Sequence, residues 1–301
     1  MFDERGYLLD AAHGRMPSPR AFREIVDILA RCRYNRLFLK TPPPGDGSSD
    51  GWDDEPSAPT PAEIRKMSAY CEMQGVGLSV SEDFAKDLSS GWVCADTAVS
   101  RSLAGRVEDM RENMEAAERE GRARGATGDL VADWGDECCW QPLAASLPAI
   151  ILGGAFASSG AKAAKMDLEL ELDRTMCVPL GGTLLRLGTL YLRGGRMGAG
   201  FSELFNILSH DHGYSRNPCL TQPVLADISG VAHGCRLVAE RWTDASDWAK
   251  EIVHMANLVD CACNRRDERR LRALRDEHGA IWRLRSREGG RTESLSRLPR
   301  F

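Results

Sequence analysis

The sequence lacks the two features that direct a chain into or across a membrane. Its first residues, Met1–Arg5, contain no basic run leading into an apolar segment, as a signal peptide would. Its longest apolar run, Leu147–Ala157, is shorter than the ~20 residues that span a bilayer. We therefore expect a cytoplasmic protein with no membrane partner.

Basic residues are also fewer than acidic residues, with 39 Lys and Arg, 44 Asp and Glu, and a net charge of −5. Nucleic-acid binding relies on a basic face that neutralises phosphates, so we expect no nucleic-acid partner.

Regular cysteine and glycine motifs are missing as well. The ten cysteines are irregularly spaced, and Cys138-Cys139 and Cys261-Ala262-Cys263 lack the two-residue gap of zinc knuckles. In a chain without an export signal, such cysteines are typical of reduced thiols in a cytoplasm. The glycine-rich stretch 193–200 lies between expected helices and not after a strand. We expect no metal and no cofactor.

What the chain does have is a repeating strand-helix pattern in its first half. Strands are expected at Gly6–Leu9, Arg36–Lys40, Val76–Ser81, Gly128–Asp133 and Ile150–Gly154. Between them, helices are expected to begin at Pro19 and Pro61, after the capping residues Ser18 and Thr60, and to cover Leu103–Arg124. Strands that alternate with helices predict a parallel sheet, either doubly wound or closed as a (β/α)8 barrel.

From about Met166 onward the pattern predicts helices alone. They are expected over Thr183–Leu192, Phe201–Leu208, Leu237–Cys263 and Arg265–Arg287. We therefore expect two domains, an α/β domain over residues 1–165 and a helical domain over residues 166–301.

The stretch Leu130–Leu143 holds the residues best suited to chemistry. A short apolar run is followed by three acids and two tryptophans: Asp133, Trp134, Asp136, Glu137 and Trp140. Carboxylates can act on a glycosidic oxygen, and indole faces stack on the apolar face of a pyranose. The alternative is a strand end with a hydrogen-bonded Asp and two core tryptophans.

Several segments, in the right order, resemble family 20 glycoside hydrolases. They are Arg5–Asp10, Gly14–Pro17 and Tyr34–Leu37 at the start of that family's barrel, Thr60–Ile64 with Gly75–Leu78, Asp133–Asp136 with Trp140–Leu143, and Ile281–Leu295 in the C-terminal helical domain of one bacterial branch. The resemblance implies a β-N-acetylhexosaminidase-like protein acting on terminal N-acetylhexosamine. It also implies that Arg5, Asp133, Trp134 and Trp140 bind the substrate.

The chain departs from this family in the middle of the barrel. A closed (β/α)8 barrel takes about 250 residues, and the ten residues between Ser81 and Trp92 cannot hold one β-α unit. Two or three central units are therefore expected to be absent. The expected fold is α/β, a shortened and incomplete (β/α)8 barrel followed by an α-helical domain.

The missing part bears directly on catalysis. In the family, an adjacent Asp-Glu pair after the fourth strand orients the substrate's acetamido group and protonates the leaving oxygen, and that strand is not found here. The chain is then a hydrolase homologue with impaired or absent catalysis, or a non-catalytic carbohydrate-binding or scaffolding protein. A third hypothesis is an active glycosidase rebuilt on Asp136 as the orienting residue and Glu137 as the general acid. Exposed sheet edges also predict one of three outcomes: a re-closed smaller sheet, a homo-oligomer that supplies the missing wall, or poor solubility.

Overall fold

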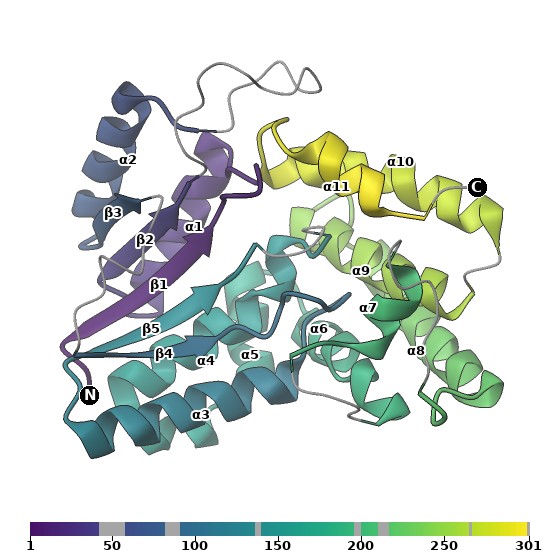
Figure 1. The fold of residues 1–301 in the computed structure, drawn as a ribbon, viewed down its shortest axis with the longest axis horizontal. Coiled ribbons are helices and arrows are strands. Elements are labelled where there is room, and N and C mark those ends of the chain that lie inside the picture. Colours follow the sequence, from purple (N-terminus) through teal and green to yellow (C-terminus); the bar gives the residue numbers. More distant parts are fainter. Residues whose placement is uncertain are drawn as a thin grey trace.

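The protein is a mixed α/β fold built around one five-stranded parallel sheet (Figure 1). The computed structural model describes residues 1–41, 58–81, 91–135, 140–195, 200–209, 217–264 and 267–299. The strands are β1 (Glu4–Asp10), β2 (Arg36–Lys40), β3 (Gly77–Ser81), β4 (Trp92–Asp96) and β5 (Gly128–Asp133), in the spatial order β3-β2-β1-β5-β4. All four pairings are parallel, which confirms the predicted parallel sheet.

The helices between these strands begin where their capping residues predict. Ser18 accepts a hydrogen bond from the backbone N–H of Ala21 at the start of α1 (Pro19–Arg31). Thr60 and Glu63 form a reciprocal capping box at the start of α2 (Pro61–Met73). A third helix, α3 (Val107–Arg124), connects β4 to β5.

Two assignments made from the sequence of the first half need correction. The expected strand Ile150–Gly154 is part of helix α4 (Leu147–Ser159), because a continuous apolar run carries no periodicity that separates a buried strand from a buried helix. Helix α3 begins at Val107 and not at the expected Leu103. The segment that begins at Trp92 after the ten-residue gap forms the edge strand β4.

Helix α4 lies within the longest apolar segment of the fold. Among the described residues, one helical segment, Leu143–Lys165, is long and apolar enough to cross a membrane, and 89% of its apolar window is buried in the protein. Gly154 lets this helix lie close to the end of α1, since a Cβ at this position would clash with the carbonyl oxygen of Cys32.

The second half is helical and lies beyond the carboxyl ends of the strands (Figure 1). It contains α5 (Leu168–Met176), α6 (Gly181–Gly188), α7 (Glu203–Leu208), α8 (Gln222–Glu240), α9 (Asp247–Cys263), α10 (Glu268–Arg285) and α11 (Arg291–Arg297). The helix expected from Leu237 through Cys263 is interrupted between α8 and α9. A single hydrophobic cluster includes Leu147 before residue 165 and Leu172 after it, so the two halves share one core.

The two faces of the sheet are packed differently. Tyr7, Leu37 and Val131 belong to the main core, together with the helices. On the opposite face, the described residues form a small cluster of Leu8, Phe38, Leu130 and Ala132, against which Trp92 and Trp134 pack. Within the described residues, helices therefore pack against one face, and β3 and β4 are the edges of an open sheet.

Candidate functional site

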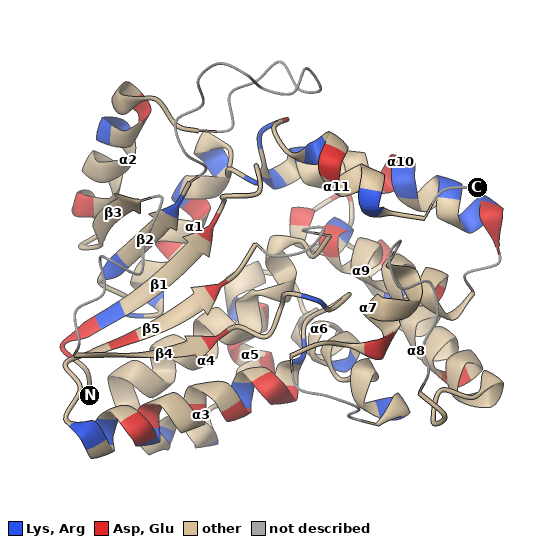
Figure 2. Cartoon of the chain, in the orientation of Figure 1, with Lys and Arg blue, Asp and Glu red and all other residues tan. Residues whose placement is uncertain are grey.

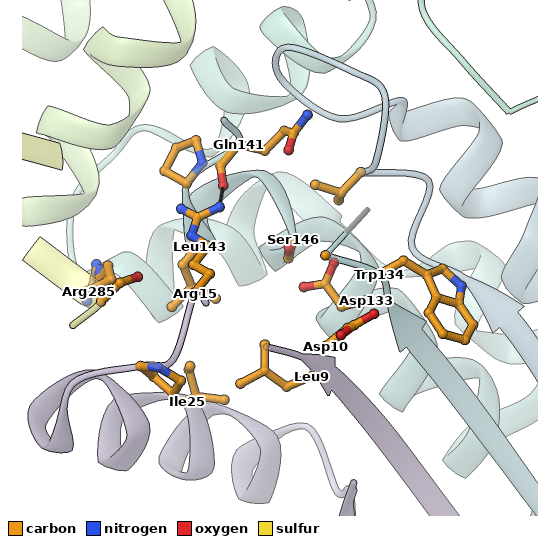
Figure 3. A pocket seen from close by; sticks show the side chains of 15 residues that line it. Leu9, Asp10, Arg15, Ile25, Asp133, Trp134, Gln141, Leu143, Ser146 and Arg285 are labelled. Carbon is orange, nitrogen blue, oxygen red and sulfur yellow. Dashed lines mark hydrogen bonds between the residues drawn. The ribbon is translucent and has the colours of Figure 1, made fainter. Parts of the chain in front are cut away.

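A small cavity lies where β1 and β5 end and the C-terminus of α10 meets them (Figure 3). It encloses about 70 Å³, and its lining includes Asp10, Arg15, Asp133, Trp134 and Arg285. These residues come from three separate parts of the chain. The bridge between Pro17 and Ser286 holds the end of α10 beside the loop that follows β1.

Asp133 is fixed at the end of β5 by neighbouring strands. Its Oδ2 accepts a hydrogen bond from the Tyr7 hydroxyl at 2.5 Å, and its Oδ1 accepts one from the Thr97 hydroxyl at 3.0 Å. Burial raises the pKa of Asp133, and the hydrogen bonds from Tyr7, Ser146 and Thr97 oppose that rise. Both oxygens of the carboxylate thus hold β5 to its neighbours.

Trp134, Lys40 and Asp10 form a group at the ends of three adjacent strands, which we call the strand-end group. The Lys40 ammonium lies 2.9 Å from Asp10 Oδ2 and 5.6 Å from the centre of the Trp134 ring. Trp134 is half-buried, and its indole points away from the side of the cavity that holds Arg15 (Figure 3). An ammonium, a carboxylate and an indole at the carboxyl ends of neighbouring strands are suited to a polyhydroxylated ligand.

Trp140 lies in the core and not at the cavity surface. Its side chain is fully buried, its ring centre lies 5.3 Å from that of Phe205, and its Nε1 donates to the Ser294 carbonyl at 3.2 Å. In this position it anchors α11, and no sugar ring reaches its faces.

Arg5 lies at the other end of the sheet. It is the second residue of β1, where its Nε donates to the Arg33 carbonyl at 2.6 Å and its Nη1 to the Phe2 carbonyl at 2.6 Å. The structure does not bring Arg5 together with Asp133 and Trp134. Asp136 and Glu137 lie outside the described residues, directly after Gly135, which lines the cavity.

Arg285 is a residue of this site that the sequence did not single out. Its guanidinium pairs with Glu251 and Glu24 and lies 3.9 Å from the centre of the Trp248 ring. Its Nη2 is buried and has no hydrogen-bond partner among the described residues. Arginine alternates with other residues over positions 283–287, and arginines in such charged stretches are most often solvated. Only the fold therefore shows that Arg285 is buried.

The size of the cavity limits what it can hold. At about 70 Å³ it is well below the roughly 300–1,000 Å³ of typical small-molecule pockets. It can admit a small polar group such as a hydroxyl or an amide, and it cannot enclose a ring-sized ligand. Within the described residues, no cluster of His, Cys, Asp and Glu could hold a metal ion.

The chain matches no protein-family model. It matches no curated protein either.

Proposed function

We propose that the protein is a carbohydrate-binding relative of family 20 glycoside hydrolases with little or no hydrolytic activity. It would bind a terminal N-acetylhexosamine at the strand-end group, with one polar substituent of the sugar in the cavity. The proposal rests on the order of the strands.

The strand order is the one expected of a barrel that has lost its middle. In a closed (β/α)8 barrel each strand pairs with the next, and the last strand pairs with the first. Here β2 and β3 follow β1 outward on one side, while the final strand β5 pairs with β1 on the other and β4 lies beyond it. The interruption falls between Ser81 and Trp92, where the sequence is too short for another β-α unit.

The helix packing supports the same interpretation. A doubly wound sheet carries helices on both faces, whereas the strands of a barrel have helices only outside. The face formed by Leu8, Phe38, Leu130 and Ala132 packs with Trp92 and Trp134 and with no helix of the described chain. That face corresponds to the interior of the shortened barrel that we propose.

Binding without turnover follows from the acids that are present. The carboxylate of Asp133 is engaged by Tyr7 and Thr97, and that of Asp10 by Lys40 and a backbone N–H. Neither is arranged as the adjacent Asp-Glu pair that the resemblance requires. Arg285 lines the cavity, and its guanidinium, whose Nη2 has no hydrogen-bond partner among the described residues, is the type of donor that suits a sugar hydroxyl or acetamido oxygen.

The test combines binding with hydrolysis. Saturation-transfer NMR with N-acetylglucosamine and N-acetylgalactosamine should show binding to the parent protein and to Trp242→Ala, a half-buried tryptophan outside the cavity, but not to Trp134→Ala. Chromogenic β-N-acetylhexosaminides should not be hydrolysed. Hydrolysis that disappears in Glu137→Gln would instead establish a site rebuilt on Asp136 and Glu137. Absence of binding to the folded parent would overturn the proposal.

A cytoplasmic location and self-association belong to the same proposal. The eight cysteines of the described residues are all free thiols, which suits a reducing compartment. The edge strands β3 and β4 offer unpaired backbone groups within the described structure, and light scattering on the purified protein would test for a dimer.

A further inference from the structure

A second cavity, remote from the strand ends, lies among the three long helices α8, α9 and α10. It encloses about 530 Å³, within the roughly 300–1,000 Å³ range of small-molecule pockets. Residues from all three helices line it, and we call it the helical groove. Charged positions of both signs lie along α10 on one side of it (Figure 2).

The wall formed by α8 combines an open space with a cation. A Cβ on Gly230 would meet no heavy atom within 4 Å, so the missing side chain contributes to the hollow. Glycine inside a helix costs roughly 0.5–1 kcal/mol relative to alanine. Farther along α8, Arg236, which lines the groove, donates to Glu240 and contacts His233 Nδ1 at 3.1 Å. This wall therefore presents a guanidinium held in position by its neighbours.

The walls formed by α9 and α10 present carboxylates in fixed positions. Glu277 Oε2 accepts a hydrogen bond from Asn257 at 2.7 Å, and its Oε1 lies 3.0 Å from His254 Nδ1. Asp260 accepts a hydrogen bond from the Ser229 hydroxyl at 2.5 Å and pairs with Arg270. The two acids are thus held at the groove by neighbours from all three helices.

The partner behind Glu277 is itself part of a buried chain of side chains. His254 Nε2 lies 3.1 Å from His278 Nδ1, and His278 Nε2 lies 3.0 Å from the Ser294 hydroxyl. Both imidazoles are buried, with 0% and 1% of their surface exposed. This chain fixes the Glu277 carboxylate in one orientation, which lowers the entropy lost when a ligand binds it.

The charges that line the groove balance. Two guanidinium groups, Arg236 and Arg270, face two carboxylates, Asp260 and Glu277, so neither a net cation nor a net anion is favoured. A ligand that carries separated charges of both signs and no net charge can form favourable charge interactions with both walls of the groove. The apolar contribution comes from Leu274 and from small side chains beside it.

We propose that the helical groove binds a small zwitterion, an α-amino acid or a dipeptide. Its ammonium group would face Glu277 and Asp260, its carboxylate would face Arg236, and an aliphatic side chain would lie against Leu274.

Isothermal titration calorimetry of the full chain with free leucine and with the dipeptide alanyl-leucine tests the proposal. At least one of the two should bind, and N-acetylation or C-terminal amidation of that ligand should weaken binding at least tenfold. Failure of both zwitterions to bind would overturn the proposal. Equal binding of the capped forms would overturn it too, since it would remove the need for two charges.

Two glycines of the same helix provide a matched pair of variants. Gly230→Leu should fill the groove and abolish binding, whereas Gly234→Leu should leave it unchanged, because Gly234 also has open space around its Cβ but does not line the groove. Both changes replace glycine with a better helix former, so both proteins should fold. Arg236→Gln should weaken binding of the zwitterion at least tenfold. Unchanged binding in Gly230→Leu would place the ligand elsewhere and refute the assignment.

Discussion

Asp129 is buried in β5 at an energetic cost that a single substitution can measure. Its side chain is only 3% exposed, and Oδ1 has no hydrogen-bond partner within the described residues. Burial, with a smaller contribution from Glu118 of α3, raises the pKa of Asp129 from its ordinary value of 3.8 to about 7. Ionisation of this carboxyl therefore opposes folding.

The magnitude and sign follow from the difference between the two pKa values. Since the folded state holds the proton more tightly than the unfolded state, the penalty is full above pH 7 and disappears as the pH falls toward 3.8. About three pKa units correspond to an upper limit of about 4 kcal/mol at pH 8, and the same relation gives about 2 kcal/mol at pH 5. Asp129→Asn removes the charge and keeps the shape.

The assay is urea unfolding of the parent and of Asp129→Asn at pH 8 and pH 5. The variant should be more stable at pH 8, and its advantage should shrink by about 2–3 kcal/mol at pH 5. Asp276→Asn, an exposed position on α10, serves as the matched control and should show no such change. An advantage that does not depend on pH, or one that grows on acidification, would refute the reasoning.

Three further predictions concern buried groups of the helical half and the cavity. Burial lowers the pKa of His278 well below 6.5, so the folded state binds fewer protons than the unfolded state. At pH values below about 6.5 the free energy of unfolding should therefore decrease, by up to about 1.4 kcal/mol per pH unit. In urea titrations, His278→Gln should flatten that slope. Trp140→Ala should lower the free energy of unfolding by about 3–5 kcal/mol, whereas the half-buried Trp134→Ala should lower it far less; equal losses would contradict the placement of Trp140 in the core. Glu251→Gln leaves the Arg285 guanidinium short of a buried partner and should destabilise the fold by about 3–5 kcal/mol, a loss visible in thermal unfolding and absent if the pair is solvated.

Local features of the fold could be predicted from the sequence. The capping residues Ser18 and Thr60 act on backbone groups three residues away, so their effect is contained in a short window. The strand Gly128–Asp133 was predicted with its observed bounds, because its apolar run is short and bounded by helix and turn residues. The run Ile150–Gly154 was misassigned because every residue in it is apolar or small.

The candidate site was harder to predict, because its partners come from distant parts of the sequence. Arg285 meets Glu24 and Glu251, which lie 261 and 34 residues away, and no local pattern records these contacts. Trp140 has the sequence context of a site residue, yet Phe205 and α11 cover it. The sequence shows which residues carry chemistry, whereas the long-range packing decides which of them reach a ligand.

Because β1 lies at the centre of the sheet, its two neighbouring strands are synthesised at different times. One neighbour, β2, ends at Lys40, but the other, β5, ends only at Asp133. At about 5–20 residues per second, a ribosome needs roughly 5–20 s to synthesise the chain between these points. During that interval β1, β2 and β3 can pair with one another, while the side of β1 that will pair with β5 has no partner strand. At each round of synthesis the chain therefore passes through an interval in which the β5 side of β1 has no partner strand.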